Sequence, residues 1–435
     1  MSVTVLKAAT PRAPSETADL RDMVSVILAN IASHGEDEVR RYAETLDRWT
    51  GPVLLDAQAR QAAAARVPAG LKESIAFAHS NIRRFAEAQR ATLTDCTVEL
   101  FPGHWAGQKS IPVSSAGCYV PGGRYSHIAS ALMTITTAKA AGVPHIVAAS
   151  PPRDGKGIPD AIVYAMDLAG ADHILNLGGV QAIAAMAEGL FGLRPADILV
   201  GPGNAFVAEA KRQLFGQVGI DMFAGPTDTL VIADKTADPE TVAWDLVGQA
   251  EHGPDSPVWL VTDHRPLAEA VMDAAPRLAA ELPEPNGPAA VAAWDAMAEV
   301  TLCDTREEMA EVADRYAPEH LHVQAAELDW WLGRLSVYGS LFLGADTTVP
   351  FGDKASGPNH VLPTSGAARY TGGLSVHKFL KTVTWQRGSE EARDRLARVT
   401  ADICRHEGME GHARSAELRR DQAPAAVQPA HGKGA

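Results

Sequence analysis

A short unit of chain recurs between residues 105 and 229, and it limits what this sequence can fold into. Each copy places an apolar, strand-like run before a turn rich in glycine or proline, which leads into a helical segment. The clearest copies are 116–124, 145–152, 174–181 and 197–204. Short apolar strands that alternate with helices are typical of βα units on a parallel sheet. The pattern therefore predicts an α/β fold.

The turns of these units suggest ligand binding without identifying the ligand. In open α/β sheets the turns at the carboxyl ends of the strands line the ligand crevice, and free amides at a helix start suit a pyrophosphate. None of the turns carries the G-x-G-x-x-G fingerprint of dinucleotide-binding folds. Glycines also occur at such turns for backbone reasons alone. The turns by themselves leave nucleotide binding and a structural role equally open.

Length and charge restrict the possible classes of protein. A chain of 435 residues exceeds one ordinary core, so about two to three domains are expected. The net charge of −14 argues against nucleic acid or an anionic membrane as partner, because phosphate binding depends on Lys and Arg. No apolar run is long enough to span a bilayer, and residues 1–7 lack the apolar core of a signal peptide. We therefore expect a cytoplasmic protein.

A metal site in this chain would have to use nitrogen and oxygen ligands. The four cysteines lie far apart without a C-x-x-C pair, which disfavours both disulfides and a thiolate zinc site. Gln249 and His252 stand three apart in a helix-like segment and so share one face. Asp353 and His412 are the candidate ligands further along the chain. Such a pair is more often a solvated or capped helix end, so spacing alone does not establish a metal site.

Two further stretches are candidates for a catalytic site. Glu319 and His320 are adjacent on a short loop before a strand-like run. A carboxylate beside an imidazole can activate water and relay a proton, but taken alone such a pair is more often a plain surface feature. The turn-rich stretch 357–364, which contains His360, has the rigid and polar character of a loop that shapes a site.

Taken together, these stretches resemble the histidinol dehydrogenase family, in the same order, from about Gly117 to Arg419. The resemblance implies a zinc- and NAD-dependent dehydrogenase that oxidises a primary alcohol through the aldehyde to the carboxylate, reducing two NAD in turn. It depends on six stretches, namely Tyr-Val-Pro-Gly-Gly at 119–123, Gly-Pro-Gly-Asn at 201–204, Gln-Ala-Glu-His at 249–252, Glu-His at 319–320, Gly-Pro-Asn-His at 357–360 and Gly-His-Ala at 411–413.

The resemblance also implies roles for individual residues. It makes Glu319 and His320 the catalytic pair, with His320 as the base for the alcohol and Glu319 as the base for water. The implied zinc ligands are Gln249, His252, Asp353 and His412. The implied NAD contacts are Tyr119, Gln181 and Asn204. The implied substrate contacts are Thr227, Gln249, His252, His320, Asp353, His360, Glu407 and His412.

The fold implied by the resemblance is α/β, with two incomplete Rossmann-like domains that contain parallel sheets. A helical N-terminal arm and a small C-terminal helical segment complete it. The C-terminal segment is exchanged in a homodimer, so that His412 and Glu407 would complete the site of the other subunit. The expected divisions are an arm at 1–20, a first Rossmann-like domain at 21–104 and 230–375 with the catalytic and zinc residues, a second at 105–229 with the NAD contacts, the exchanged segment at 376–421 and a disordered tail at 422–435.

Departures from the family pattern bear on the substrate. Histidinol-oxidising members have Ser-Glu where this chain has Thr227-Asp228, and Leu-Thr-Ala where it has 409–411. Stretches 369–374 and 379–387 are similar to the paralogous branch that includes sulfopropanediol 3-dehydrogenase, which acts on small anionic diols. Glu407, like the stretch 357–364, instead matches the histidinol enzymes. The sequence favours a substrate-divergent member, with oxidation of L-histidinol to L-histidine as the alternative.

Three basic side chains and two non-enzymatic interpretations bear on this prediction. Lys354, Arg124 and His377 could reach an anionic substrate, but we expect each to be a solvated charge. A non-catalytic zinc-binding dimer would not need the Glu319–His320 pair. An NAD-binding regulator would not need the zinc ligands, so the enzymatic interpretation accounts for more of the sequence.

Overall fold

The structure is a computed structural model that describes residues 3–10, 17–122, 127–222 and 225–420. It divides into two compact units. The main unit comprises the described residues up to Arg90 and from Pro112 to Phe379. The small unit comprises Ala91–Ile111 and the described residues from Leu380 onward. Each unit is described by itself.

A six-stranded sheet forms one half of the main unit. Its order is β1-β11-β10-β9-β12-β13, and every pair is parallel except β1 with β11. The strands are β1 (Thr4–Lys7), β9 (Thr229–Ala233), β10 (Val258–Thr262), β11 (Ala298–Leu302), β12 (His320–Gln324) and β13 (Ser340–Leu343). Residues 4–7 of the expected arm are therefore an edge strand of this sheet.

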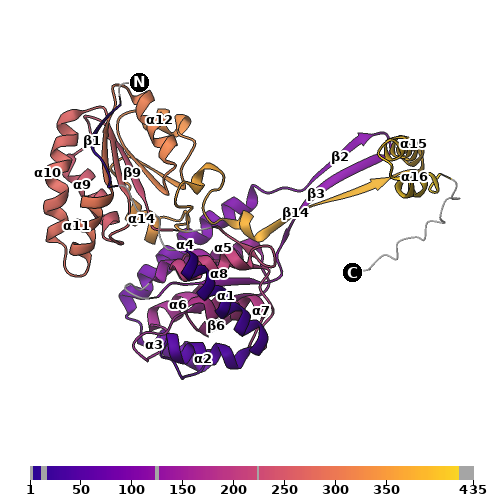
Figure 1. Cartoon of the computed structure of the whole chain (residues 1–435), viewed down its shortest axis with the longest axis horizontal. Helices are drawn as coiled ribbons and strands as arrows, with labels where there is room; N and C mark the ends of the chain where they lie inside the picture. Colours follow the sequence, from indigo (N-terminus) through magenta and orange to yellow (C-terminus); the bar gives the residue numbers. More distant parts are fainter. Residues whose placement is uncertain (1–2, 11–16, 123–126, 223–224, 421–435) are drawn as a thin grey trace. The chain divides into compact units, whose positions relative to one another are not determined.

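Helices cover both faces of the six-stranded sheet, because successive side chains of its strands point to opposite faces. Val231 of β9 packs toward α9, α10 and α11, whereas Leu230 packs toward α12 and α13. Figure 1 shows α9, α10 and α11 on one side of β9 and α12 on the other. The helices are α9 (Pro239–Ala250), α10 (Arg265–Glu281), α11 (Asn286–Met297), α12 (Arg306–Tyr316) and α13 (Leu328–Arg334). A short helix α14 and two 3-10 turns follow, at Val349–Lys354, Ala367–Arg369 and Val376–Phe379.

A five-stranded parallel sheet forms the other half of the main unit, in the order β6-β5-β4-β7-β8. Its strands are β4 (Ala116–Tyr119), β5 (Ile146–Ser150), β6 (His173–Asn176), β7 (Ile198–Val200) and β8 (Gly219–Ile220). The connecting helices are α5 (Ile128–Ala141), α6 (Asp160–Ala169), α7 (Gly179–Glu188) and α8 (Ala205–Leu214). The α/β fold with parallel sheets that the repeated βα pattern predicts is confirmed.

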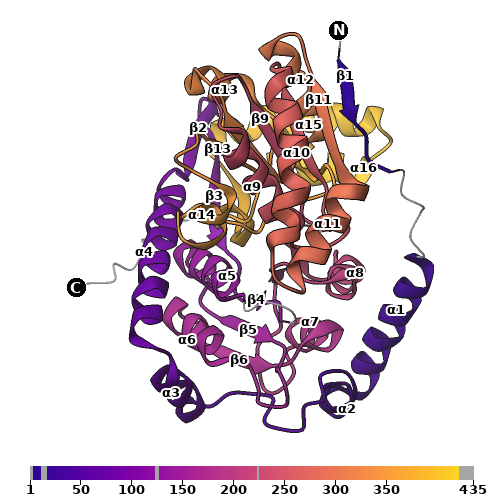
Figure 2. The same cartoon turned by 90° about the vertical axis from the view of Figure 1, so that its left-hand side faces the viewer.

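The N-terminal helices pack differently from the sequence-based division, which grouped residues 21–104 with 230–375. Val24, Ile31 and Val39 join the core of the five-stranded sheet beside α7 (Figure 2). Arg60 donates to the backbone oxygens of Ala171 and Asp172, next to β6. An amphipathic helix shows which of its faces is apolar but not which sheet will cover that face. The helices are α1 (Thr17–His34), α2 (Glu36–Leu46), α3 (Ala57–Arg66) and α4 (Ala69–Ala91).

The small unit is a three-stranded sheet with a helical hairpin. Strand β14 pairs with β3, which pairs with β2, so residues 91–111 belong with the C-terminal segment rather than with the first domain of the sequence-based division. Nothing in the local pattern of either stretch reveals this pairing. The elements are β2 (Cys96–Phe101), β3 (His104–Pro112), β14 (Leu380–Gly388), α15 (Glu390–His406) and α16 (Glu410–Glu417). The expected tail at 422–435 lies outside the described residues.

Within the described ranges, no helix has both the length and the apolar character needed to cross a membrane.

Candidate functional site

A polar pocket of about 540 Å³ lies in the main unit where loops of the two sheets meet. From the five-stranded sheet come residues 127–130 and Pro202, which follow the carboxyl ends of β4 and β7. From the six-stranded sheet come residues at the amino ends of β9 and β12, together with the end of α9 and part of α14. The predicted residues that line it are Thr227, Gln249, His252, Glu319, His320, Asp353 and His360.

Glu319 is held by one of its two carboxylate oxygens. The Thr227 hydroxyl donates to Oε2 at 2.6 Å, and the Asp228 backbone N–H donates to the same atom at 3.2 Å. Oε1 accepts no hydrogen bond from the described residues. Burial of the side chain raises the pKa of Glu319 to about 7. The carboxylate is thus oriented by Oε2, with the pKa expected of a general base near neutral pH.

His320 is oriented so that one ring nitrogen remains available. Its Nδ1 donates to the backbone oxygen of Asp228 at 3.1 Å, so the neutral ring carries its lone pair on Nε2. Nε2 is buried, lies 3.6 Å from Asp353 Oδ1 and has no hydrogen-bond partner among the described residues. Burial opposes the charged imidazolium, but the carboxylates of Glu319 and Asp353 outweigh it and raise the pKa of His320 to about 9. Near pH 7 the ring is therefore protonated, and Nε2 can accept a proton only after this imidazolium has been deprotonated.

Three of the four predicted metal ligands line the pocket beside this pair. Gln249 is 2% exposed, and its Oε1 has no partner among the described residues. His252 is exposed at the pocket mouth, yet the surrounding atoms desolvate its ring and lower its pKa, so the imidazole is neutral near pH 7. Burial favours the neutral form of Asp353, but the neighbouring positive charge of His320 prevails and lowers the pKa of that carboxyl. An amide oxygen, a neutral imidazole and a carboxylate are all suitable zinc ligands.

In the part of the chain that the structure describes, no three His, Cys, Asp or Glu side chains form a metal-binding group by themselves. A set of three ligands that includes His252 and Asp353 would therefore have to use the amide oxygen of Gln249.

His360 joins the two sides of the polar pocket. Its Nδ1 donates to the backbone oxygen of Asp353 at 2.7 Å, and its Nε2 accepts from the Ser130 hydroxyl at 3.0 Å. Burial lowers the pKa of His360, which keeps the ring neutral. The surrounding loop is anchored to α5, because the Asn359 amide donates to the backbone oxygen of Met133 at 2.9 Å. Both ring nitrogens of this predicted substrate contact are thus engaged by the protein.

His127 and Lys354 are two further polar residues that line the polar pocket. His127, at the start of α5, lines the pocket, and desolvation lowers its pKa to about 4. No sequence motif marks His127 as a site residue, because it stands alone in its turn. Lys354 lines the pocket rim with 67% of its side chain exposed, so it is both solvated and close to the site. His377 is exposed in a 3-10 turn, and Arg124 lies outside the described residues.

A second and more apolar cavity of about 910 Å³ lies on the five-stranded sheet of the main unit. It brings together Tyr119, Gln181 and Asn204, the three predicted NAD contacts. The Tyr119 hydroxyl accepts from the Gly179 N–H at 3.1 Å, and Asn204 caps α8 by accepting from the Val207 N–H at 3.1 Å. Its apolar lining comes mainly from Met23, Val26, Ile27, Leu46, Pro121, Pro151, Pro152 and Phe206.

Asp47 anchors the turn that carries Gln181. Its Oδ2 accepts from the Gly178 N–H and from Gln181 Nε2, both at 2.9 Å, which leaves Gln181 Oε1 buried without a partner among the described residues. Gly178 has to lack a side chain, because a Cβ there would lie 2.5 Å from Pro151. The sequence missed Asp47 because an aspartate after a helix resembles an ordinary helix end, and its partner lies 131 residues away.

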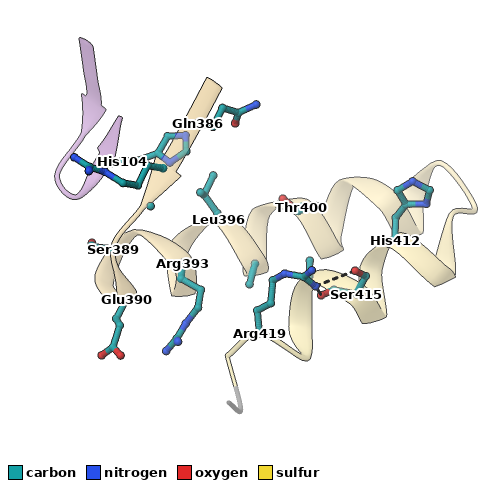
Figure 3. A pocket seen from close by; sticks show the side chains of 14 residues that line it. His104, Gln386, Ser389, Glu390, Arg393, Leu396, Thr400, His412, Ser415 and Arg419 are labelled. Carbon is teal, nitrogen blue, oxygen red and sulfur yellow. Dashed lines mark hydrogen bonds between the residues drawn. The ribbon is translucent and has the colours of Figure 1, made fainter. Parts of the chain in front are cut away.

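The remaining predicted residues, His412 and Glu407, belong to the small unit and are exposed there. His412 lies on α16 and lines a small-unit pocket of about 560 Å³ with Arg393 and Arg419 (Figure 3). Arg419 donates to the Ser415 hydroxyl at 3.0 Å. The structure therefore places the fourth predicted zinc ligand in a different compact unit from the other three.

Comparison with known proteins adds three findings. A sequence model of the family described as histidinol dehydrogenase matches residues 10–420. Two proteins of Ruegeria pomeroyi are similar over 419 residues: one called histidinol dehydrogenase homolog is 67% identical, covering 96% of this chain and 97% of that protein, and one called sulfopropanediol 3-dehydrogenase is 61% identical, covering 96% of each. The crystal structure of histidinol dehydrogenase from Elizabethkingia anophelis aligns with a TM-score of 0.88 at 32% identity, covering 94% of each chain.

Proposed function

Since the chain belongs to the histidinol dehydrogenase family, we propose that it is a zinc- and NAD-dependent dehydrogenase that oxidises a small polar primary alcohol through the aldehyde to the carboxylate. The main support is the polar pocket, where Glu319 Oε1 and His320 Nε2 are separately oriented and each accepts a proton when its side chain is deprotonated. A four-electron oxidation needs a base for the alcohol and a base for water, and these atoms meet both requirements.

In this proposal zinc is held by Gln249, His252, Asp353 and His412. The fit is supported by the buried Gln249 Oε1, which has no partner among the described residues, and by the low pKa values of His252 and Asp353. When bound, zinc would hold and polarise the substrate oxygen without carrying electrons.

The apolar cavity is the proposed NAD site, with Tyr119, Gln181 and Asn204 as polar contacts. Its volume and apolar lining suit a dinucleotide, and the unpartnered Gln181 Oε1 offers an acceptor to a ligand hydroxyl or amide. Gly178 and Gly179 begin α7 beside this cavity, and their amides already donate to Asp47 and to the Tyr119 hydroxyl, so these two glycines would shape the site rather than bind phosphate themselves.

The chain's own residues would act in two steps. In the first, His320 Nε2 takes the hydroxyl proton of the alcohol while hydride passes from the carbinol carbon to NAD, giving the aldehyde. In the second, Glu319 Oε1 takes a proton from water as the water oxygen bonds to the aldehyde carbon. Hydride then passes from the resulting hydrate anion to a second NAD, which gives the carboxylic acid, and the acid releases its proton to solvent to leave the carboxylate.

We further propose that the active protein is a homodimer in which the small unit contributes His412 and Glu407 to the other subunit's site. The support is the composition of this unit, in which the described part of the helical hairpin encloses a small core cluster of Ala401, Cys404 and Ala413. So small a core contributes little stability by itself. Large apolar side chains are also exposed on the unit, among them Val98, Leu100, Val399, Ile403 and Leu418. Such a surface is typical of an interface.

The proposed substrate is a small anionic diol, as in the sulfopropanediol 3-dehydrogenase that is 61% identical to this chain. Lys354 at the rim of the polar pocket supports a negatively charged substrate. The alternative is L-histidinol, supported by Glu407, whose carboxylate would suit an ammonium group. A non-catalytic zinc-binding dimer remains the remote alternative.

The substrate is tested by offering the zinc-loaded protein NAD with 2,3-dihydroxypropane-1-sulfonate or with L-histidinol, and following NADH absorbance. We expect turnover with the sulfonate and two NADH per alcohol consumed. Faster turnover with histidinol would replace the proposed substrate by the alternative. Binding of zinc and NAD without oxidation of any small primary alcohol in a wider panel would contradict a dehydrogenase and favour the non-catalytic dimer.

Asp47→Ala is expected to raise the KM for NAD about tenfold or more while kcat changes little. The variant removes the acceptor that holds Gln181 and the Gly178 amide, and hydrogen bonds to a charged group contribute about 1.5 to 3 kcal/mol each. Initial rates at varied NAD measure the effect. Asp47→Asn keeps one acceptor oxygen and should recover most of the affinity; an unchanged KM in the alanine variant would show that Gln181 needs no anchor.

A further inference from the structure

The dipeptide Thr227–Asp228, just before β9, contacts both members of the proposed catalytic pair. The Thr227 hydroxyl donates to Glu319 Oε2 at 2.6 Å, and the Asp228 N–H donates to the same oxygen at 3.2 Å. The backbone oxygen of Asp228 accepts from the backbone N–H of His320 at 3.3 Å and from its ring Nδ1 at 3.1 Å. One short segment thus orients the carboxylate and fixes the tautomer of the imidazole.

We propose that Thr227 is a positioning residue for the Glu319 carboxylate, a role distinct from the substrate contact that the family resemblance implies. Its hydroxyl proton is already donated to Oε2, which leaves Oε1 as the atom that takes the proton from water. The inference rests on the proposed two-step oxidation, in which Glu319 serves the second step.

The contacts separate the effect of Thr227 from that of Asp228. The Asp228 carboxylate accepts the Glu319 backbone N–H at 2.6 Å and the Ser365 N–H at 3.3 Å, so it fixes the backbone of both loops. His320 is held by the Asp228 main chain, which a substitution at position 227 leaves in place. Loss of the Thr227 hydroxyl should therefore affect Glu319 and leave His320 oriented.

The hydroxyl also favours the ionised form of the carboxylate. Glu319 is buried beside a second carboxylate, Asp228, and both burial and that like charge favour its neutral form. The donated hydrogen bond from Thr227 and the neighbouring His320 favour the charged form. Asp353 faces His320 rather than Glu319. Removing the hydroxyl should therefore raise the pKa of Glu319 and leave fewer molecules with the active base.

Thr227→Val tests the inference, because valine keeps the branched shape and removes only the hydroxyl. We expect the rate of aldehyde oxidation to fall on the order of 10- to 100-fold, as for the loss of a hydrogen bond to a charged group, while alcohol oxidation changes little. The lower limb of the pH profile of aldehyde oxidation should move to higher pH. Thr227→Ser keeps the donor and should recover the rate that the valine variant loses.

Thr229→Val is the matched control. Thr229 is fully buried in β9, and its Oγ1 has no hydrogen-bond partner in the described part of the chain. The same exchange two residues away should therefore leave both steps unchanged. A rise in the KM for the alcohol in Thr227→Val, with both steps slowed equally, would make Thr227 a substrate contact and overturn the inference.

A titration separates this inference from the proposed function. The glutamate carboxyl groups of the zinc-loaded protein are labelled with carbon-13. The NMR signal that disappears in Glu319→Gln belongs to Glu319, and its shift with pH reports the ionisation of that carboxyl group. We expect Thr227→Val, but not Thr227→Ser, to raise the pKa of that signal. An unchanged pKa overturns the inference whatever the substrate, whereas an unreactive wild-type protein with the expected titration overturns only the proposed function.

Discussion

Glu319→Gln is expected to stop the oxidation at the aldehyde, so that each alcohol molecule reduces one NAD instead of two. Glutamine has nearly the same shape and can accept the hydrogen bonds from Thr227 and Asp228 through its amide oxygen. It cannot take a proton from water, and the loss of a general base typically slows a step by about 10²- to 10⁴-fold. His320 remains in place for the first step. NADH counted against alcohol consumed, together with detection of free aldehyde, measures the outcome.

The pH dependence gives this prediction a second measurement. Burial raises the pKa of Glu319 to about 7, and its active form is the deprotonated carboxylate. Aldehyde oxidation should therefore be fully present above that pKa and be lost as the pH falls through it. Glu319→Gln should show a low rate without this lower limb. If the variant still forms two NADH per alcohol at the wild-type rate, another group activates the water.

The repeated βα pattern predicted the parallel sheets because the alternation of strand and helix is local. Each unit of 116–204 carries its own strand, turn and helix, and the strands are buried enough to appear as continuous apolar runs. The pairing of β1 with β11 could not be predicted in this way, since Thr4 lies opposite Leu302. The same holds for β14, which joins a hairpin formed by residues 96–112.

The candidate site shows the same division between local signals and tertiary packing. Glu319 and His320 are adjacent, and Gln249 and His252 share a helix end, so each pair was visible as a possible centre of chemistry. That Gln249 and Glu319 line one pocket follows from the packing of β9, β10 and β12, which no spacing encodes. Only the family resemblance assigned the two pairs to one site, because their motifs occur in this chain in the same order as in the family.

Residues that act through another side chain were the hardest to predict. Asp47 matters because of Gln181, 134 residues away, and Thr227 because of Glu319, 92 residues away. Neither contact leaves a pattern in the neighbouring sequence. The amino-end position of the catalytic pair was equally hidden, because the rule for open sheets points to the carboxyl ends of the strands. It holds here for the loops after β4 and β7 and fails for those before β9 and β12.

His320→Asn is expected to abolish alcohol oxidation, by about 10³-fold or more, while zinc remains bound. Asparagine can still donate to the Asp228 backbone oxygen but offers no basic nitrogen at the position of Nε2. Metal content should be unchanged, because His320 is not one of the proposed ligands. Asp353→Ala is the contrasting variant and should lose zinc, since it removes a proposed ligand. Metal analysis of the purified variants beside NADH formation distinguishes the two.

The two catalytic variants also make opposite predictions when the aldehyde is supplied directly. His320→Asn keeps Glu319, so it should oxidise added aldehyde with one NADH per molecule although it cannot use the alcohol. Glu319→Gln should use the alcohol but leave added aldehyde almost untouched. If both variants failed at the same step, the two side chains would be acting as one coupled acid–base unit, and the assignment of one base to each oxidation would be wrong. The distance of 3.6 Å between His320 Nδ1 and Glu319 Oε2 is short enough for such coupling.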